Sequence, residues 1–189
     1  MKKNIKRRDF LKKAAVGGAA VAASTSIGAP AIAAGHQEWI VCSAFGKAGL
    51  LGQAIQAFAD SINNYSDKLN IKVYHAGELV PGLESLDAVR SGAAQASYGA
   101  PYYWTNLSDA IEFVATCPFG MNAMEQNAWC YYGGGIEEAD KIYNSLGLKF
   151  LPMGNTGNQM GGWFNKEINT PDDYKGLKMR MPGLGGRTI

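Results

Sequence analysis

Two polar side chains near the end of the chain have the residue types and the setting of a carboxylate-binding site. Arg180 follows Leu177 and Met179 in an apolar run, where an unpaired charge would be costly to bury. A guanidinium presents paired N–H donors at the separation of two carboxylate oxygens, so one Arg can hold an organic acid in a fixed orientation. Gln159 lies in a glycine-flanked turn, and its amide offers a donor and an acceptor to a neighbouring oxo or hydroxyl group. By residue type alone, a surface-facing Arg and a solvated Gln remain alternatives.

The predicted elements put these two side chains on two strands that can face one cleft. The runs 160–164 and 177–181 are expected to be strands, with Gln159 at the start of the first and Arg180 inside the second. Between them, Thr170 and Pro171 followed by two Asp residues have the pattern of a helix N-terminus, which favours capping over paired-carboxylate catalysis. The Gly-rich run 183–186 is expected to begin a helix, because it lacks the Gly-Lys-Ser/Thr of a phosphate-binding loop.

The preceding part of the chain alternates strands and helices, which predicts a parallel sheet covered by helices. Strands are expected at 38–45, 70–75 and 96–99, with helices at 51–65 and 83–92 between them. In such sheets ligands bind beyond the carboxyl ends of the strands. Tyr102 and Tyr103 directly follow the third strand and are candidates for a ligand wall, although packing of a helix on the sheet explains them equally well.

The pattern farther along the chain is less regular. It predicts a strand or an extended crossover at 113–121, a helix end and a turn at 129–135, a helix at 136–146 and a strand at 148–153. No change in composition marks a linker, so the domain boundary is placed by the pattern of elements alone. It is expected between residues 120 and 125.

The block 155–186 closely resembles one protein family. It contains the run GNQMGGWFNKEI followed by GLKMRMPGLGG, which is similar to the DctP-type extracytoplasmic solute receptors of TRAP (tripartite ATP-independent periplasmic) transporters. The nearest branch is the one that binds 2-oxo acids and related monocarboxylates. The resemblance, which extends from about residue 38 to residue 186, implies an α/β, two-lobed periplasmic binding protein fold that is type II-like. It also implies an N-terminal fragment that holds the first lobe and the start of the second.

The same resemblance implies a transport function without catalysis. Arg180 stands at the place of the receptors' carboxylate-clamping arginine, and Gln159 at that of a glutamine that contacts substrate. In the 2-oxo acid branch this glutamine also helps to hold a cation. Bound Na or Ca is therefore left open for the complete receptor, with other ligands expected beyond residue 189 and no further cofactor required. The implied partners are a small organic acid and the membrane subunits of the transporter. Arg187 stands where the receptor motif often carries an acid.

Residues 1–33 have the pattern of a twin-arginine (Tat) signal peptide. Lys6, Arg7 and Arg8 precede a Gly/Ala-rich apolar run and a small-residue end, so we expect export to the periplasm and cleavage near Ala33. The apolar run is shorter than the ~20 residues that a transmembrane anchor needs. This segment holds seven Lys or Arg and one Asp, so a total charge of +2 leaves the rest near −4. That balance argues against a nucleic-acid partner. We expect a first α/β lobe over 34–122 and an incomplete second lobe over 123–189.

Other candidates for chemistry are few. Cys42, Cys117 and Cys130 have no CxxC spacing, so a Cys117–Cys130 bridge and small buried thiols both remain open. His36 and His75 are the only two histidines, which is a poor supply for a metal site or a catalytic triad. The alternative function is a Tat-exported, cofactor-dependent periplasmic enzyme, and the lack of a Cys cluster or nucleotide-binding loop argues against it.

Overall fold

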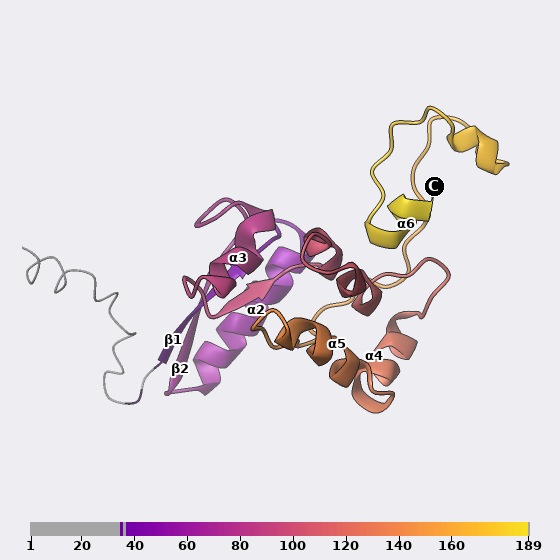
Figure 1. Ribbon diagram of the computed structural model, residues 1–189. Helices are drawn as coiled ribbons and strands as arrows, with labels where there is room; N and C mark the ends of the chain where they lie inside the picture. The colour runs from indigo at the N-terminus through magenta and orange to yellow at the C-terminus, as the bar shows by residue number, and fades with distance from the viewer. Residues whose placement is uncertain (1–34, 36, 189) are drawn as a thin grey trace, which may run out of the picture.

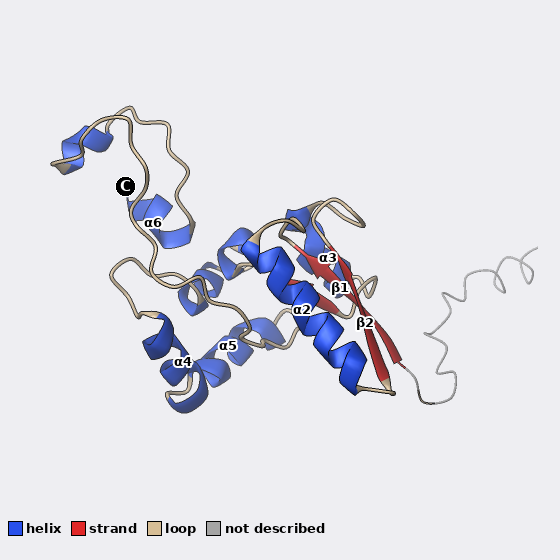
Figure 2. Cartoon of the chain, turned by 180° about the vertical axis from the view of Figure 1, so that it is seen from behind, coloured by secondary structure: helices blue, strands red, loops and turns tan. Residues whose placement is uncertain are grey.

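A three-stranded parallel sheet with a helix on each face forms one end of the molecule (Figure 1). The computed structural model describes residue 35 and residues 37–188, so the predicted signal peptide, its cleavage site and His36 lie outside the described residues. Strands β1 (Gln37–Ser43), β2 (Leu69–Tyr74) and β3 (Ala96–Tyr98) pair in the order β2-β1-β3. Helix α2 (Leu50–Tyr65) covers one face and α3 (Ser85–Arg90), preceded by the short η1 (Gly82–Glu84), covers the other, as the two opposite views show (Figure 2). The predicted order of these strands and helices is confirmed.

The alternation of side chains along β1 builds a separate apolar layer on each face of the sheet. Val41 points to the α2 side, where it packs with Ile55 and Ile71. The next residue, Cys42, points to the α3 side and packs with Ala88. Because successive strand residues face opposite sides, a continuous apolar run in β1 is what a strand covered by helices on both faces requires.

One side chain of α2 forms hydrogen bonds with the backbone at the outer edge of β2. The Asn63 amide nitrogen donates to the backbone carbonyl of Ile71 at 2.9 Å. The Asn63 amide oxygen accepts from the backbone N–H of the same residue at 2.6 Å. The outward-facing donor and acceptor of Ile71 are therefore both satisfied without a further strand.

Residues on both sides of the predicted domain boundary share one core. The later elements are η2 (Pro101–Trp104), η3 (Asp109–Val114), α4 (Ala123–Tyr132) and α5 (Gly135–Asn144). Asn122 precedes helix α4, and its side chain caps the helix together with Glu125. The buried members of the cluster come from α3, η2, η3 and α5: Leu86, Trp104, Ile111, Val114, Ala139 and Tyr143. Elements before and after residue 122 therefore pack together in this structure. The division into lobes at residue 122 stays a prediction.

The predictions for α4, α5 and the Gly-rich helix start are confirmed, whereas the strand or extended crossover at 113–121 is wrong at its beginning. The chain there belongs to the 3-10 helix η3, which starts where the Ser108 side chain accepts from the Ala110 N–H at 3.3 Å. The Gly-rich run 183–186 lies in α6 (Gly183–Thr188). None of the helices over the described residues is both long and apolar enough to cross a membrane.

The strands predicted at 148–153, 160–164 and 177–181 are also wrong. In the part of the chain that the structure describes, none of these segments pairs with another strand. Between residues 151 and 182, the backbone–backbone hydrogen bonds found among described residues are confined to the turn around η4 (Pro171–Tyr174). The segments 160–164 and 177–181 run as loops away from the sheet (Figure 1). Their apolar alternation is that of strands, but a strand also needs a neighbour for its backbone groups.

Candidate functional site

The structure brings three of the four predicted site residues together. Tyr102 and Tyr103 lie in η2, and their rings meet edge to face with centroids 5.1 Å apart. Burial, followed by the neighbouring Tyr103, raises the pKa of the Tyr102 phenol. The Arg180 guanidinium, which lies close to Tyr102, opposes this pKa shift. A cation therefore stands beside Tyr102, one of two half-buried phenols just past the carboxyl end of β3.

Gln159 lies apart from this group. Its side chain is exposed, and the amide nitrogen donates to the Thr156 hydroxyl at 3.0 Å. A groove of about 670 Å³ is lined by residues 162–165 on one side and 176–180 on the other, so it ends at Arg180 without including Gln159. The joint action of Gln159 and Arg180 on one ligand thus stays a prediction.

Two further aromatic residues extend the wall that Tyr102 and Tyr103 begin. Phe45 follows β1, and its ring centroid lies 5.4 Å from that of Tyr98 and 6.1 Å from that of Tyr103. Tyr98 ends β3, and burial raises the pKa of its phenol. A Cβ added at Gly154 would lie 2.5 Å from the Tyr98 hydroxyl, so the chain passes close to the end of this side chain. Phe45 and Tyr98 were not among the predicted site residues, although their positions at the carboxyl ends of parallel strands carried the signal.

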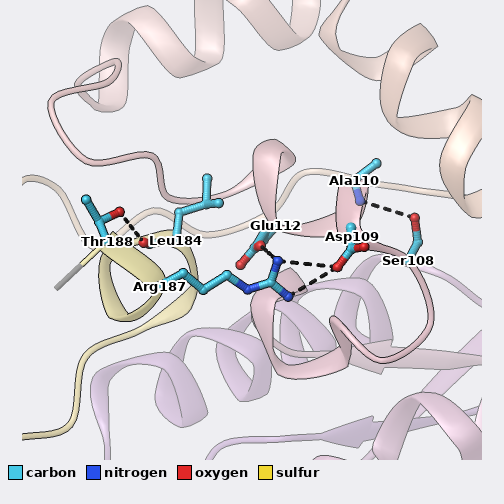
Figure 3. A network of polar contacts seen from close by, with 7 residues as sticks. All are labelled: Ser108, Asp109, Ala110, Glu112, Leu184, Arg187 and Thr188. Atoms are coloured by element: carbon cyan, nitrogen blue, oxygen red, sulfur yellow. Dashed lines mark hydrogen bonds and ion pairs between the residues drawn. The ribbon is translucent and has the colours of Figure 1, made fainter.

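An ion-pair network ties the end of the described chain to η3 (Figure 3). The Arg187 guanidinium lies 3.2 and 3.3 Å from Asp109 Oδ1 through its two terminal nitrogens. Its Nη1 also lies 3.0 Å from Oε1 of Glu112, a residue with 0% exposure. Neither carboxylate oxygen of Glu112 has a well-aligned hydrogen-bond donor among the described residues. Within this part of the chain, the positive charge of Arg187 is therefore what offsets the cost of burying the Glu112 carboxylate. This network could not be predicted from the sequence, because residues so far apart in the chain show no local pattern.

The three cysteines are free thiols in this structure. Cys42 and Cys130 are buried and Cys117 is half-buried, and burial raises the pKa of each thiol. The Cys117–Cys130 bridge that the sequence left open is not formed, whereas the reading of Cys42 and Cys130 as small buried residues is confirmed.

Ligands for a metal ion are scarce in the described part of the chain. No group of three or more His, Cys, Asp or Glu side chains there could hold one. His75 is buried with 4% exposure, and neither ring nitrogen has a hydrogen-bond partner among the described residues. Gln159 could contribute one amide oxygen, since its nitrogen is the atom engaged by Thr156. A cation held through Gln159 would therefore need further ligands from outside these residues.

The family model, the curated relative and the solved structures that this chain matches all belong to extracellular solute-binding proteins. Residues 44–188 match the model of the bacterial extracellular solute-binding protein family 7, DctP. The chain is 40% identical to a monocarboxylate 2-oxoacid-binding periplasmic protein of Nostoc sp., a match that covers 98% of this chain and 52% of the relative. The chain thus spans about half the length of this curated relative.

Two solved structures are similar at 42% sequence identity and a TM-score of 0.77, each match covering 80% of this chain and 47% of the other. One is a TRAP periplasmic solute binding protein from Pseudoalteromonas atlantica with bound sodium and pyruvate. The other is a TRAP periplasmic solute binding protein from Colwellia psychrerythraea with bound calcium and pyruvate. Since the family model covers most of the sequence and the parallel sheet agrees with these relatives, the chain belongs to the bacterial extracellular solute-binding proteins of family 7 and holds about half of their two-lobed α/β fold.

Proposed function

We propose that the protein captures a 2-oxo acid such as pyruvate in the periplasm and delivers it to the membrane subunits of a TRAP transporter. The observation that carries this proposal is the Arg180 guanidinium beside the Tyr102 phenol, at the carboxyl edge of the parallel sheet. The relatives described above support it, because two of them hold pyruvate and a third is named for 2-oxo acid binding. Binding and release make or break no covalent bond, so the proposed role is not enzymatic.

Arg180 is proposed as the clamp for the carboxylate. A planar guanidinium can donate two parallel hydrogen bonds to the two oxygens, which fixes the orientation of a small acid. Arg180 is exposed and holds one phenol contact, so its other N–H groups are available to a ligand. Tyr102 and Tyr103 would flank the short carbon chain, while the nearby Phe45 and Tyr98 would keep water from it.

Gln159 is proposed to contact the oxo group and to contribute one oxygen to a sodium or calcium ion. In the structure the Gln159 side chain lies outside the groove that ends at Arg180. Its role therefore requires the loop 151–162 to move toward the sheet when ligand binds. Movement of one lobe against the other around a hinge is a common way for binding proteins to achieve this.

We propose that the hinge between the two lobes lies near residue 151 rather than near residue 122. The core shared by η3 and α5 extends to Phe150, whose ring lies 5.2 Å from that of Tyr143. Leu151, directly after it, is 74% exposed. A hinge is better accommodated where core packing ends than inside a packed cluster.

The proposal also includes the export route, which is a Tat signal peptide with cleavage near Ala33.

The proposal is tested by calorimetric titration and thermal shift of the exported protein, expressed from its complete reading frame. Pyruvate, longer 2-oxo acids, hydroxy acids and dicarboxylates would be added, each with sodium, with calcium and with neither. A ligand at a hundred times its dissociation constant should stabilise the folded protein by about 2.7 kcal/mol. For a protein of about 150–250 residues that corresponds to a rise in Tm of roughly 5–10 °C, and a longer chain shifts less.

Variants at Arg180 and one matched control make the test specific to the clamp. Arg180→Ala should abolish the shift, and Arg180→Lys should restore little of it, because an ammonium cannot form the bidentate contact. Arg90→Ala is the control, since Arg90 pairs with Asp87 on the exposed surface of α3. Absence of a shift with any 2-oxo acid, or an unaltered shift in Arg180→Ala, would overturn the proposal.

A further inference from the structure

The ion pairs of Arg187 join the two parts of the chain that carry different halves of the proposed site. Helix η3, which holds Asp109 and Glu112, closely follows η2 with its two tyrosines. Helix α6, which holds Arg187, begins shortly after Arg180. Figure 3 shows the Arg187 side chain reaching from α6 to both carboxylates of η3. The contact therefore bridges the tyrosine side and the arginine side of the site.

The two carboxylates differ in how strongly they can hold Arg187. The Asp109 side chain is 87% exposed, so water and salt screen its attraction. The Glu112 side chain is 1% exposed, and an ionised carboxylate in such a place needs an opposite charge close by. The contact between Glu112 and Arg187 at 3.0 Å is therefore the part of the network that fixes α6 to η3.

The start of α6 lies directly against the tyrosine side of the site. A Cβ added at Gly183 would lie 3.0 Å from the Tyr102 Cβ and 3.3 Å from Glu112 Oε2. The backbone of Gly183 has a φ of +48°, in the left-handed region that favours glycine. Arg180 precedes this close approach and Arg187 follows it. The ion pair between Arg187 and Glu112 therefore fixes the position of the turn between the two arginines.

We propose that Arg187 is a positioning residue of the binding site, whose ion pair with Glu112 holds α6 on η3 and thereby keeps the Arg180 guanidinium at the Tyr102 hydroxyl. The consequence for ligand affinity rests on the proposed function, because it assumes that Arg180 clamps the carboxylate. The consequence for the position of Arg180 does not depend on any ligand.

Three variants separate positioning from folding. Arg187→Met leaves the Glu112 carboxylate buried without a cation, so it can unfold the protein locally. The double variant Glu112→Gln/Arg187→Met removes both charges while keeping side chains of similar size, so it should stay folded. Arg187→Lys restores a positive charge at the same place. Arg90→Met is the matched control, because its exposed ion pair with Asp87 has the same N–O distance of 3.2 Å as that between Arg187 and Asp109.

The first measurement is the titration of the Tyr102 phenol by NMR of ring-labelled tyrosine, assigned with Tyr102→Phe. Burial, the neighbouring Tyr103 and the Arg180 guanidinium all act on this phenol, so its midpoint reports how α6 and Arg180 lie against it. We expect the midpoint to move away from its original value in Arg187→Met and in the double variant, to return toward that value in Arg187→Lys, and to stay unchanged in Arg90→Met. An unchanged midpoint in the folded double variant would overturn the inference.

The second measurement is the dissociation constant for pyruvate by isothermal titration calorimetry. We expect the double variant to bind pyruvate about 2- to 30-fold more weakly, the range for residues that act on a site without touching the ligand. Wild-type affinity in the folded double variant would count against Arg187. If the unaltered protein binds no 2-oxo acid, the proposed function fails, while the Tyr102 titration still decides whether Arg187 positions Arg180.

Discussion

Replacement of Asn63 by Ala tests whether one side chain closes the edge of the sheet. Asn63 donates to the carbonyl of Ile71 at 2.9 Å and accepts from its N–H at 2.6 Å. Ile71 is 6% exposed, so water has little access to these backbone groups once the amide is removed. The variant loses two hydrogen bonds and leaves a donor and an acceptor without partners.

The expected loss of stability follows from these two contacts. A hydrogen bond between neutral groups contributes about 0.5–1.5 kcal/mol net, so two of them contribute about 1–3 kcal/mol. Alanine forms helix more readily than asparagine, which returns roughly 0.5 kcal/mol. The free energy of unfolding should therefore fall by about 0.5–2.5 kcal/mol. The loss is larger if no water molecule reaches the unpaired N–H and carbonyl of Ile71 in the variant.

Equilibrium unfolding in urea, followed by far-UV circular dichroism, measures this loss. Gln56→Ala is the matched control, because Gln56 is an amide on the same helix whose Nε2 donates to Asp60 at 2.9 Å on the exposed surface. The control should change the free energy of unfolding by less than about 0.5 kcal/mol. Equal midpoints for the two variants at an unchanged m-value would refute the argument that Asn63 closes the edge.

The remaining predictions concern one buried donor and one exposed carboxylate. Trp104→Phe should lower the free energy of unfolding by about 1–3 kcal/mol, since the Leu83 carbonyl loses the indole N–H that donates to it at 2.8 Å; a urea midpoint within error of the original would contradict this. Hydrogen bonds from the Thr170 and Asn169 backbone lower the pKa of Asp173. Because the folded-state pKa lies below the unfolded one, the stabilisation is present above the unfolded pKa and is lost as pH falls through the folded pKa. Asp173→Asn should therefore be less stable than the original near neutral pH and equal to it at roughly pH 2 in the same urea assay, and a deficit independent of pH would exclude this cause.

The first half of the fold could be predicted from sequence because its signals are local. Apolar runs rich in β-branched residues predicted β1 and β2, and the helical spacing of Ile55 and Ala59 predicted α2. The strands predicted around Gln159 and Arg180 failed for a non-local reason. Alternation shows that a segment can be a strand, but pairing depends on which other segment lies beside it.

The candidate site was predictable in its residue types and only partly in its arrangement. The sequence block around Arg180 gave the family, which the comparisons confirm. The structure places Arg180 beside Tyr102, two residues that the sequence singled out for different reasons, one from the block and one from its position after β3. Their role in binding stays a prediction. The pairing of Arg187 with Glu112 had no local signal, because a buried acid in a helical turn looks like any other acid in the sequence.

The sparse backbone hydrogen bonding between residues 151 and 182 has a consequence for the energetics of capture. Amide protons in this segment should exchange with solvent far faster than those of β1, whose backbone is paired on both sides. If ligand is clamped by Arg180, part of the binding free energy is spent on ordering this segment. Affinity should then fall steeply with temperature, since the conformational entropy lost on ordering weighs more heavily as the protein warms. The rest of the molecule, held by its core and sheet, would contribute little to that dependence.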